Sequence, residues 1–243
     1  VEASINSIKY ILKSFKKAEI ILTFACDNLI DYLSIKNKTA LLNLGLDNCD
    51  IEHLLDTKQD NDDNRKILQF ILLKSIINKV GACYYTPFFI QGKKTHRAYW
   101  LLHFSNHPTA RNEMVKLHYE NYNSFIHYGG EGLDMFGYST QDKYTLKPFL
   151  FTEEDKIKGL ELIKKQIQSK VKKYDNQTFD TLIQNEINNT PATIETIQES
   201  LKEQLYYGDI EIINPKTNKK IKKYTDIKLK YIIKDTKQQR FEF

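Results

Sequence analysis

The chain has 243 residues, of which 41% are hydrophobic, so it is long enough to bury one large core or two modest ones. No apolar run approaches the roughly 18 to 20 residues that a membrane helix needs, and the first residues lack the pattern of a signal peptide, so we expect a cytoplasmic protein without membrane contact. The three cysteines are odd in number and show no CxxC spacing, which argues against a disulfide framework or a zinc knuckle. The formal net charge of +5 is a mild excess of basic residues.

The first part of the chain shows a helical pattern followed by a strand pattern. Apolar residues at helical spacing predict a helix over residues 5–15. The continuous apolar run at residues 18–25 predicts a strand that is buried on both faces of a parallel sheet. Asp27 follows this strand and fits the N-cap of a helix that extends through residue 33.

The next part of the chain combines a polar stretch, a helix and a hairpin. Residues 36–64 are rich in Asn and Asp, and we expect them to form an excursion outside the sheet. A helix is predicted over residues 67–80, where Gly81 stops it. Two aromatic-rich runs, residues 84–91 and 97–105, then predict an antiparallel hairpin.

This order of elements predicts an α/β fold. Helix, strand, helix and antiparallel hairpin is the order of the second half of a class I methyltransferase sheet, and a helix over residues 109–121 follows it. Residues 1–120 are therefore predicted to form a partial Rossmann methyltransferase-like domain. Because the chain opens inside a helical pattern, the first strand and glycine-rich turn of such a sheet are expected to precede Val1. Glycines and Pro148 indicate that residues 121–150 are a connecting segment.

Residues 151–243 predict a second domain, an α+β winged helix-turn-helix. The pattern gives helices that start at Thr152, Thr178 and Ile194, with a tight turn before the third one. Two strands then follow, over residues 209–213 and 228–233, around a lysine-rich loop. Helix, turn, helix, strand, basic loop and strand is the order of a winged helix, whose second helix and wing usually meet the DNA duplex.

Two segments of the chain resemble the three-Cys-motif partner (TcmP) family. They are residues 18–34, AEIILTFACDNLIDYLS, and residues 81–115, GACYYTPFFIQGKKTHRAYWLLHFSNHPTARNEMV, in which SNHP at Ser105 to Pro108 is the most distinctive piece. The resemblance spans most of residues 1–120, whereas the C-terminal part matches more in pattern than in letters.

The resemblance implies a Rossmann methyltransferase with an appended winged helix, associated with a three-Cys-motif radical-SAM-type protein. In the family, the glycine-rich segment and an acidic motif precede the position equivalent to Val1. Binding of S-adenosylmethionine is therefore expected only together with such a preceding segment.

Two residues of the first domain are candidate catalytic groups. Ligands of open α/β sheets bind beyond the carboxyl ends of the strands, which selects Asp27 and His107. Histidine exchanges protons near neutral pH, so His107 suits a general base or a substrate contact. The alternatives are that Asp27 only caps a helix and that His107 is a turn residue bonded to nearby backbone. His103 and His107 lie four residues apart across a strand end, without an HExxH pattern, so no metal site is predicted.

The second domain holds the candidate nucleic-acid contacts. Lys219, Lys220, Lys222 and Lys223 lie in the predicted wing, where they can contact phosphates, and Thr193 opens the helix that would read the groove. Carboxylates on that helix, at Glu195, Glu199 and Glu203, oppose contact with the DNA backbone. A merely solvated hairpin and a winged helix used for protein contact therefore both stay open.

Two functions follow from these patterns. The first is a fragment of an S-adenosylmethionine-dependent methyltransferase-like protein that acts on, or binds, nucleic acid such as double-stranded DNA. The alternative is a non-catalytic DNA-binding or partner-binding protein that assembles with a three-Cys-motif protein.

Overall fold

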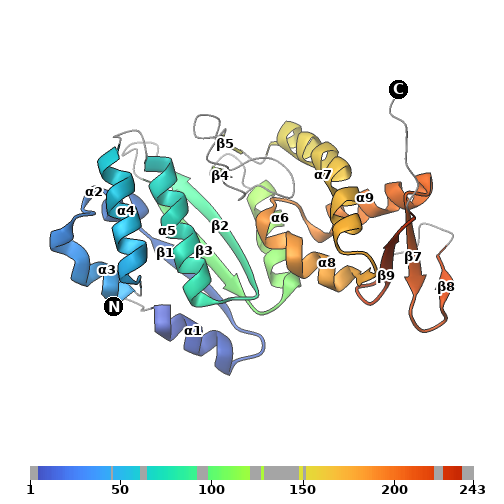
Figure 1. Cartoon of the computed structure of the whole chain (residues 1–243), viewed down its shortest axis with the longest axis horizontal. Helices are drawn as coiled ribbons and strands as arrows, with labels where there is room; N and C mark the ends of the chain where they lie inside the picture. The colour runs from blue at the N-terminus through green and yellow to red at the C-terminus, as the bar shows by residue number, and fades with distance from the viewer. Residues whose placement is uncertain are drawn as a thin grey trace. The chain divides into compact units, whose positions relative to one another are not determined.

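The computed structural model divides into two compact units, residues 1–128 with 139–150 and residues 129–138 with 151–243 (Figure 1). The residues that the structure describes are 5–44, 46–60, 65–91, 98–120, 127–128, 148–149, 152–221 and 227–236. Within these ranges, no helix has the length and apolar character that crossing a membrane requires. We refer to the two parts as unit 1 and unit 2 and describe each by itself.

Unit 1 is a three-stranded sheet with helices packed on it. Its elements, in chain order, are α1 (Ile5–Ser14), β1 (Glu19–Phe24), α2 (Cys26–Asp31), η1 (Ile35–Asn37), α3 (Lys38–Leu44), α4 (Asn48–Asp60), α5 (Arg65–Val80), β2 (Tyr84–Gln91), β3 (Ala98–Ser105) and α6 (Pro108–Glu120). Helices α1, α2 and α4 all pack against α5, and Figure 1 shows α4 and α5 side by side in front of the sheet. The predicted hairpin and the helices around it are confirmed.

The strand order in unit 1 is β1-β3-β2, and β3 runs antiparallel to both neighbours. The register pairs Glu19 with Ser105 at one end and Phe24 with Trp100 at the other. The prediction that β1 is buried on both faces of a parallel sheet is therefore wrong. Its residues alternate between exposed and half-buried, and Ile21 is 56% exposed. A continuous apolar run cannot show by itself which partners cover it.

The two faces of this sheet differ in chemistry. Successive residues of a strand point to opposite faces, so Leu102 and Phe104 of β3 lie on one face and His103 and Ser105 on the other. Residues that pair across strands share a face with their partners. Leu102 and Phe104 are fully buried and belong to the apolar core. On β2 and β3 the second face carries buried polar side chains and α6 packs on these two strands, whereas Ile21 of β1, on the same face, is exposed. This polar interior adjoins the candidate site.

The stretch predicted as an excursion lies outside the sheet in its described part, but it is helical there and contributes to the core. Leu41, Leu46, Ile51 and Leu54 from this stretch are all buried. Two aspartates of this Asp-rich stretch cap α4. Asp47 Oδ1 accepts from the backbone N–H of Asp50, whose Oδ2 accepts in turn from the N–H of Asp47.

The two ends of α2 show how this helix starts and how it is closed. Asp27 is not an N-cap, because α2 already begins at Cys26 and Ala25 occupies the cap position without a side-chain bond. At the C-terminus of α2, Lys58 Nζ donates to the carbonyl oxygens of Ile30 at 2.7 Å and Leu33 at 3.0 Å. A lysine from α4 thus satisfies carbonyls that the helix leaves open.

Asn106 joins the end of β3 to the end of α1. Its side-chain Nδ2 donates to the carbonyl oxygen of Leu12 at 2.7 Å and of Phe15 at 2.9 Å. These carbonyls lie at the end of α1 and just after it, and that of Phe15 also accepts from the backbone N–H of Ala18 at 3.3 Å. Asn106 therefore has a structural role within the SNHP segment.

Unit 2 is a helical layer on a small antiparallel sheet. Its elements are α7 (Glu153–Lys173), β6 (Gln177–Thr178), α8 (Phe179–Glu186), η5 (Ile187–Asn189), α9 (Ile194–Tyr207), β7 (Ile210–Asn214), β8 (Lys219–Lys220) and β9 (Ile232–Asp235). The strand order is β6-β9-β7-β8. Ile167, Phe179, Ile197 and Ile212 are fully buried, so all three helices and the sheet contribute to one core.

The helices of unit 2 agree with the sequence, whereas the last strand begins later than predicted. Thr178 and Thr193 cap α8 and α9 through their hydroxyl oxygens, and Gly208 ends α9 with φ of 76°. The last strand starts at Ile232 rather than at residue 228. Most of the predicted connecting segment lies outside the described residues, which show there only the paired strands β4 (His127–Tyr128) and β5 (Pro148–Phe149).

The first prediction concerns Asn106. We expect Asn106→Ala to lower the free energy of unfolding by about 1 kcal/mol, because two hydrogen bonds to the C-terminus of α1 are lost. Urea unfolding of the whole chain, followed by circular dichroism, measures this change. Asn78→Ala, which removes an exposed asparagine of α5, is the control and should change stability by less than about 0.5 kcal/mol.

The second prediction concerns the ion pair that links α7 and α8. Lys170 Nζ lies 3.1 Å from Glu186 Oε2, and the Glu186 side chain is only 4% exposed. Lys170→Met leaves a buried carboxylate without its cation and should cost about 3 kcal/mol, whereas Lys170→Met with Glu186→Leu should cost much less. Lys158→Met breaks the exposed pair with Glu154 and should change little. Equal losses for the single and double variants at Lys170 and Glu186 would contradict the prediction.

Candidate functional site

A cavity of about 700 Å³ lies in unit 1, where β1 begins and β3 ends. Small-molecule sites have volumes of this order. Its apolar lining consists of Ala18, Ala110, Met114 and Leu117. Its polar and charged lining consists of Lys17, Glu19, Ser105, His107, Thr109, Glu113, Lys116 and Glu120. The residues come from the start of β1, the end of β3 and one face of α6.

His107 lines this cavity and also caps α6. Its Nδ1 accepts a hydrogen bond from the backbone N–H of Thr109 at 3.2 Å. The backbone N–H of His107 donates to Ser105 Oγ at 2.9 Å, so hydrogen bonds to the Ser105 hydroxyl and to the His107 ring both hold the turn before α6. A neutral ring in this arrangement carries its proton on Nε2, which makes no hydrogen bond to any described residue. The structure thus shows the turn role that was considered for His107, because Nδ1 accepts a hydrogen bond from nearby backbone. A catalytic role of His107 stays a prediction.

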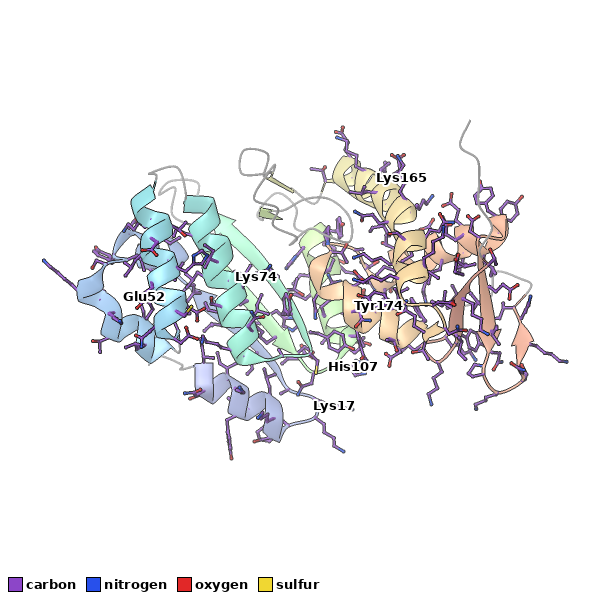
Figure 2. The ribbon with its side chains drawn as sticks, viewed as in Figure 1. Lys17, Glu52, Lys74, His107, Lys165 and Tyr174 are labelled. Carbon is purple, nitrogen blue, oxygen red and sulfur yellow. The ribbon has the colours of Figure 1, made fainter. Side chains whose placement is uncertain are left out.

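The two predicted catalytic positions lie at opposite ends of the sheet. The sequence placed both beyond the carboxyl ends of strands, but β1 and β3 are antiparallel, so these ends are separated by the length of β1, about 17 Å. Figure 2 shows His107 at the same end of unit 1 as Lys17. Asp27 follows the far end of β1, and its side chain lies outside the described part of the structure. The two residues therefore do not form one site.

A smaller hollow of about 310 Å³ lies at the Asp27 end of the sheet. It is largely apolar and is lined by residues of β1, α2, η1 and α3, namely Phe24, Ala25, Asn28, Leu29, Tyr32, Leu33, Asn37 and Leu41. Few of these side chains are able to orient a polar ligand, which makes the larger cavity the better candidate.

A buried polar cluster adjoins the larger cavity, between α6 and the sheet. His103, Arg111 and His118 are 0%, 1% and 0% exposed. Burial lowers the pKa of Arg111 to about 9, against the influence of Tyr119 and Tyr85 nearby. Burial also lowers the pKa of His103, and the Glu19 carboxylate opposes this shift. His103 is therefore neutral at pH 7.

Glu19 connects this cluster to the cavity. Its Oε2 lies 3.5 Å from Nε2 of His103. This distance is long for a hydrogen bond, and neither ring nitrogen of His103 is hydrogen-bonded to any described residue. Glu19 itself is 60% exposed and lines the cavity, so a buried histidine stands directly behind a carboxylate that a ligand can reach.

Sequence reasoning missed Glu19, His103 and Arg111. It considered His103 only as a metal ligand beside His107, although the alternation of residues 101–105 places His103 on the same face as Ser105. Likewise, Arg111 and His118 are seven residues apart and so share one face of a helix. Across the described ranges, no group of three His, Cys, Asp or Glu residues is arranged to hold a metal ion.

The predicted nucleic-acid residues of unit 2 are partly described. Lys219 and Lys220 form β8, are exposed, and pair with the end of β7. The Lys220 ammonium forms an ion pair with Glu211 of β7. Thr193 Oγ1 accepts from the N–H of Thr196 and so caps α9. Lys222 and Lys223 lie outside the described residues.

The solvent side of α9 is acidic at its start and aromatic at its end. Glu195 and Glu199 are exposed, whereas Glu203 forms an ion pair with Lys164 of α7. Tyr206 and Tyr207 are 68% and 51% exposed. Their rings meet edge to face, with centroids 5.2 Å apart. This helix therefore offers carboxylates and aromatic rings, rather than cations, to a partner.

We compared the chain with protein-family models, with curated proteins and with solved structures, and none of the three comparisons found a match.

Proposed function

We propose that this protein binds nucleic acid, with double-stranded DNA as the first candidate, through the lysine-rich hairpin of unit 2. The supporting observation is the charge of the described hairpin residues, 210–221 and 227–231. They carry five lysines against one glutamate, Glu211, which gives a net charge of +4. The five are Lys216, Lys219, Lys220, Lys228 and Lys230, and all are exposed. Clustered lysines of this kind attract the phosphate backbone.

We also propose that unit 2 is a winged helix. The order α7, β6, α8, α9, β7 and β9 supports this assignment, as does the pairing of β9 with both β6 and β7. In a winged helix, the connection between the strands that follow the helices forms the wing, and in unit 2 this is the connection from β7 to β9. The exposed lysines lie in this connection, which makes it the element to contact phosphates.

In this proposal the wing, rather than α9, makes the main contact. Exposed Glu195 and Glu199 near the start of α9 would repel phosphates in a groove-reading position. Gln198 of the same helix donates to the carbonyl oxygen of Ile227, so this side chain is already used to hold the connection against α9. Binding would then be electrostatic and largely independent of sequence.

We further propose that unit 1 is methyltransferase-like. The insertion of β3 between β1 and β2, antiparallel to both, supports the predicted closing edge of such a sheet. Activity with S-adenosylmethionine would need a glycine-rich cofactor turn, whereas β1 passes into α2 through Ala25 without a glycine. Methyl transfer to nucleic acid is therefore proposed only for a protein that carries such a turn.

The third prediction tests the wing. Titration of the whole chain into labelled duplex DNA should show an affinity that falls roughly 100-fold between 50 and 200 mM salt, because about four phosphates are neutralised. Lys216→Glu with Lys219→Glu should weaken binding at least about tenfold and flatten the salt dependence. Lys165→Glu with Lys172→Glu reverses two exposed lysines of α7 instead and is the matched control (Figure 2). Equal losses in both double variants would refute a specific role of the wing.

A second candidate function is assembly with a protein, for which the three-Cys-motif radical-SAM-type protein is the proposed partner. The observation in favour is the exposed pair Tyr206 and Tyr207 at the end of α9, because tyrosines are enriched in protein interfaces. A non-catalytic binding protein of this kind would use α9 for the partner.

The fourth prediction tests this second function. The tagged chain, co-expressed with the three-Cys-motif protein, should retain it through purification. Tyr206→Ser with Tyr207→Ser should reduce recovery at least about fivefold, since exposed aromatic anchors carry much of the energy of an interface. Tyr10→Ser with Tyr32→Ser removes two tyrosines of unit 1 that are 70% and 71% exposed and should leave recovery unchanged. Recovery that does not depend on Tyr206 and Tyr207 would contradict the α9 interface.

A further inference from the structure

The cavity beside α6 has no part in the proposed nucleic-acid contact, which belongs to unit 2. Its lining carries three glutamates and two lysines, a net charge of −1 with histidine neutral. Lys116 forms an ion pair with Glu113 at 2.9 Å, which removes one charge of each sign. Glu19, Glu120 and Lys17 remain. The cavity is therefore mildly acidic, unlike the protein as a whole, whose net charge is +5.

Acidic side chains alone do not make a site, but the histidine behind Glu19 is an independent observation. His103 is completely buried, and its ring nitrogens make no hydrogen bond to any described residue. Thr86, its neighbour across β2, also has a buried hydroxyl without a partner in the described residues. Leaving such groups without partners costs about 1 to 3 kcal/mol each. Nε2 of His103 lies 3.5 Å from Glu19 Oε2.

The rest of the lining indicates which cation fits. Met114 and Leu117 lie on the cavity side of α6, and Leu117 is 45% exposed. Ala18 and Ala110 add small apolar surfaces. A ligand that fills this space therefore needs an apolar body, and a positive group on it would reach the Glu19 carboxylate. A bare metal ion would leave the apolar walls without contact.

We propose that this cavity binds a small molecule with a protonated primary amine on a short apolar chain. The ammonium group donates to Glu19, the chain packs on Met114 and Leu117, and the buried ring of His103 lies 3.5 Å behind the carboxylate. This site is independent of the nucleic-acid contact, so the failure of either proposal leaves the other unaffected.

The fifth prediction uses n-butylamine as the probe and the whole chain, with binding followed by NMR. We expect n-butylamine to bind at least tenfold more tightly than n-butanol or butyrate, which share its chain but lack the cation. The imidazole resonances of His103 should shift during the titration, whereas those of His53, an exposed histidine of α4, should not.

Two variants separate the site from non-specific attraction. Glu19→Gln removes the negative charge at a half-exposed position and should weaken n-butylamine binding about tenfold. Glu52→Gln makes the same change on α4, away from the cavity, and should have no effect (Figure 2). Equal binding of n-butylamine and n-butanol, or unchanged binding in Glu19→Gln, would overturn the proposal. Tighter binding of butyrate would also overturn it and would indicate an anion site near Lys17.

Discussion

β3 pairs with β1 on one side and with β2 on the other, and it runs against both. This pairing brings the end of β3 to the start of β1, so Ser105 lies opposite Glu19. The turn that follows β3 then holds α1 through Asn106 and starts α6 through His107. Helix α6 and the start of β1 together enclose the larger cavity. If β3 ran parallel to β1, His107 would lie near Asp27 instead.

The same pairing explains the polar interior beneath α6. Residues of β3 alternate between the faces, so Leu102 and Phe104 fill the apolar core while His103 faces α6. Helix α6 contributes Arg111 and His118 to this interior. The ring nitrogens of His103 make no hydrogen bond to any described residue, and burying such a group is expensive, so a fold that retains it beside a cavity is using stability for something other than packing. The buried His103 lies next to Glu19, which makes Glu19 the candidate functional residue of the cavity.

The sequence was sufficient where local chemistry decides the structure. Thr193 and Gly208 bound α9, and Gly81 ends α5 with φ of 64°, because caps and glycines act over a few residues. The sequence was insufficient where contacts with distant segments decide the structure. The run at residues 18–25 looks the same whether a strand is central or exposed, and Ile21 shows that one face of β1 is open. Asp27 resembled a cap because nothing local distinguishes the first turn of a helix from the residue before it.

The candidate sites also divide into residues that the local sequence could identify and residues that only the structure brings together. His107 was found because it follows the end of a strand, a position readable from one segment, whereas Glu19 and His103 meet only through the pairing of β1 with β3, which are far apart in the sequence. In unit 2, the lysine hairpin was readable from composition, but its partial neutralisation by Glu211 was not. A hairpin with one lysine committed to a carboxylate, beside a helix with exposed glutamates, suits a contact that follows the phosphate backbone and avoids the base edges. Under the proposal that unit 2 binds nucleic acid, its charges therefore favour a contact that holds the phosphate backbone over one that reads the base sequence.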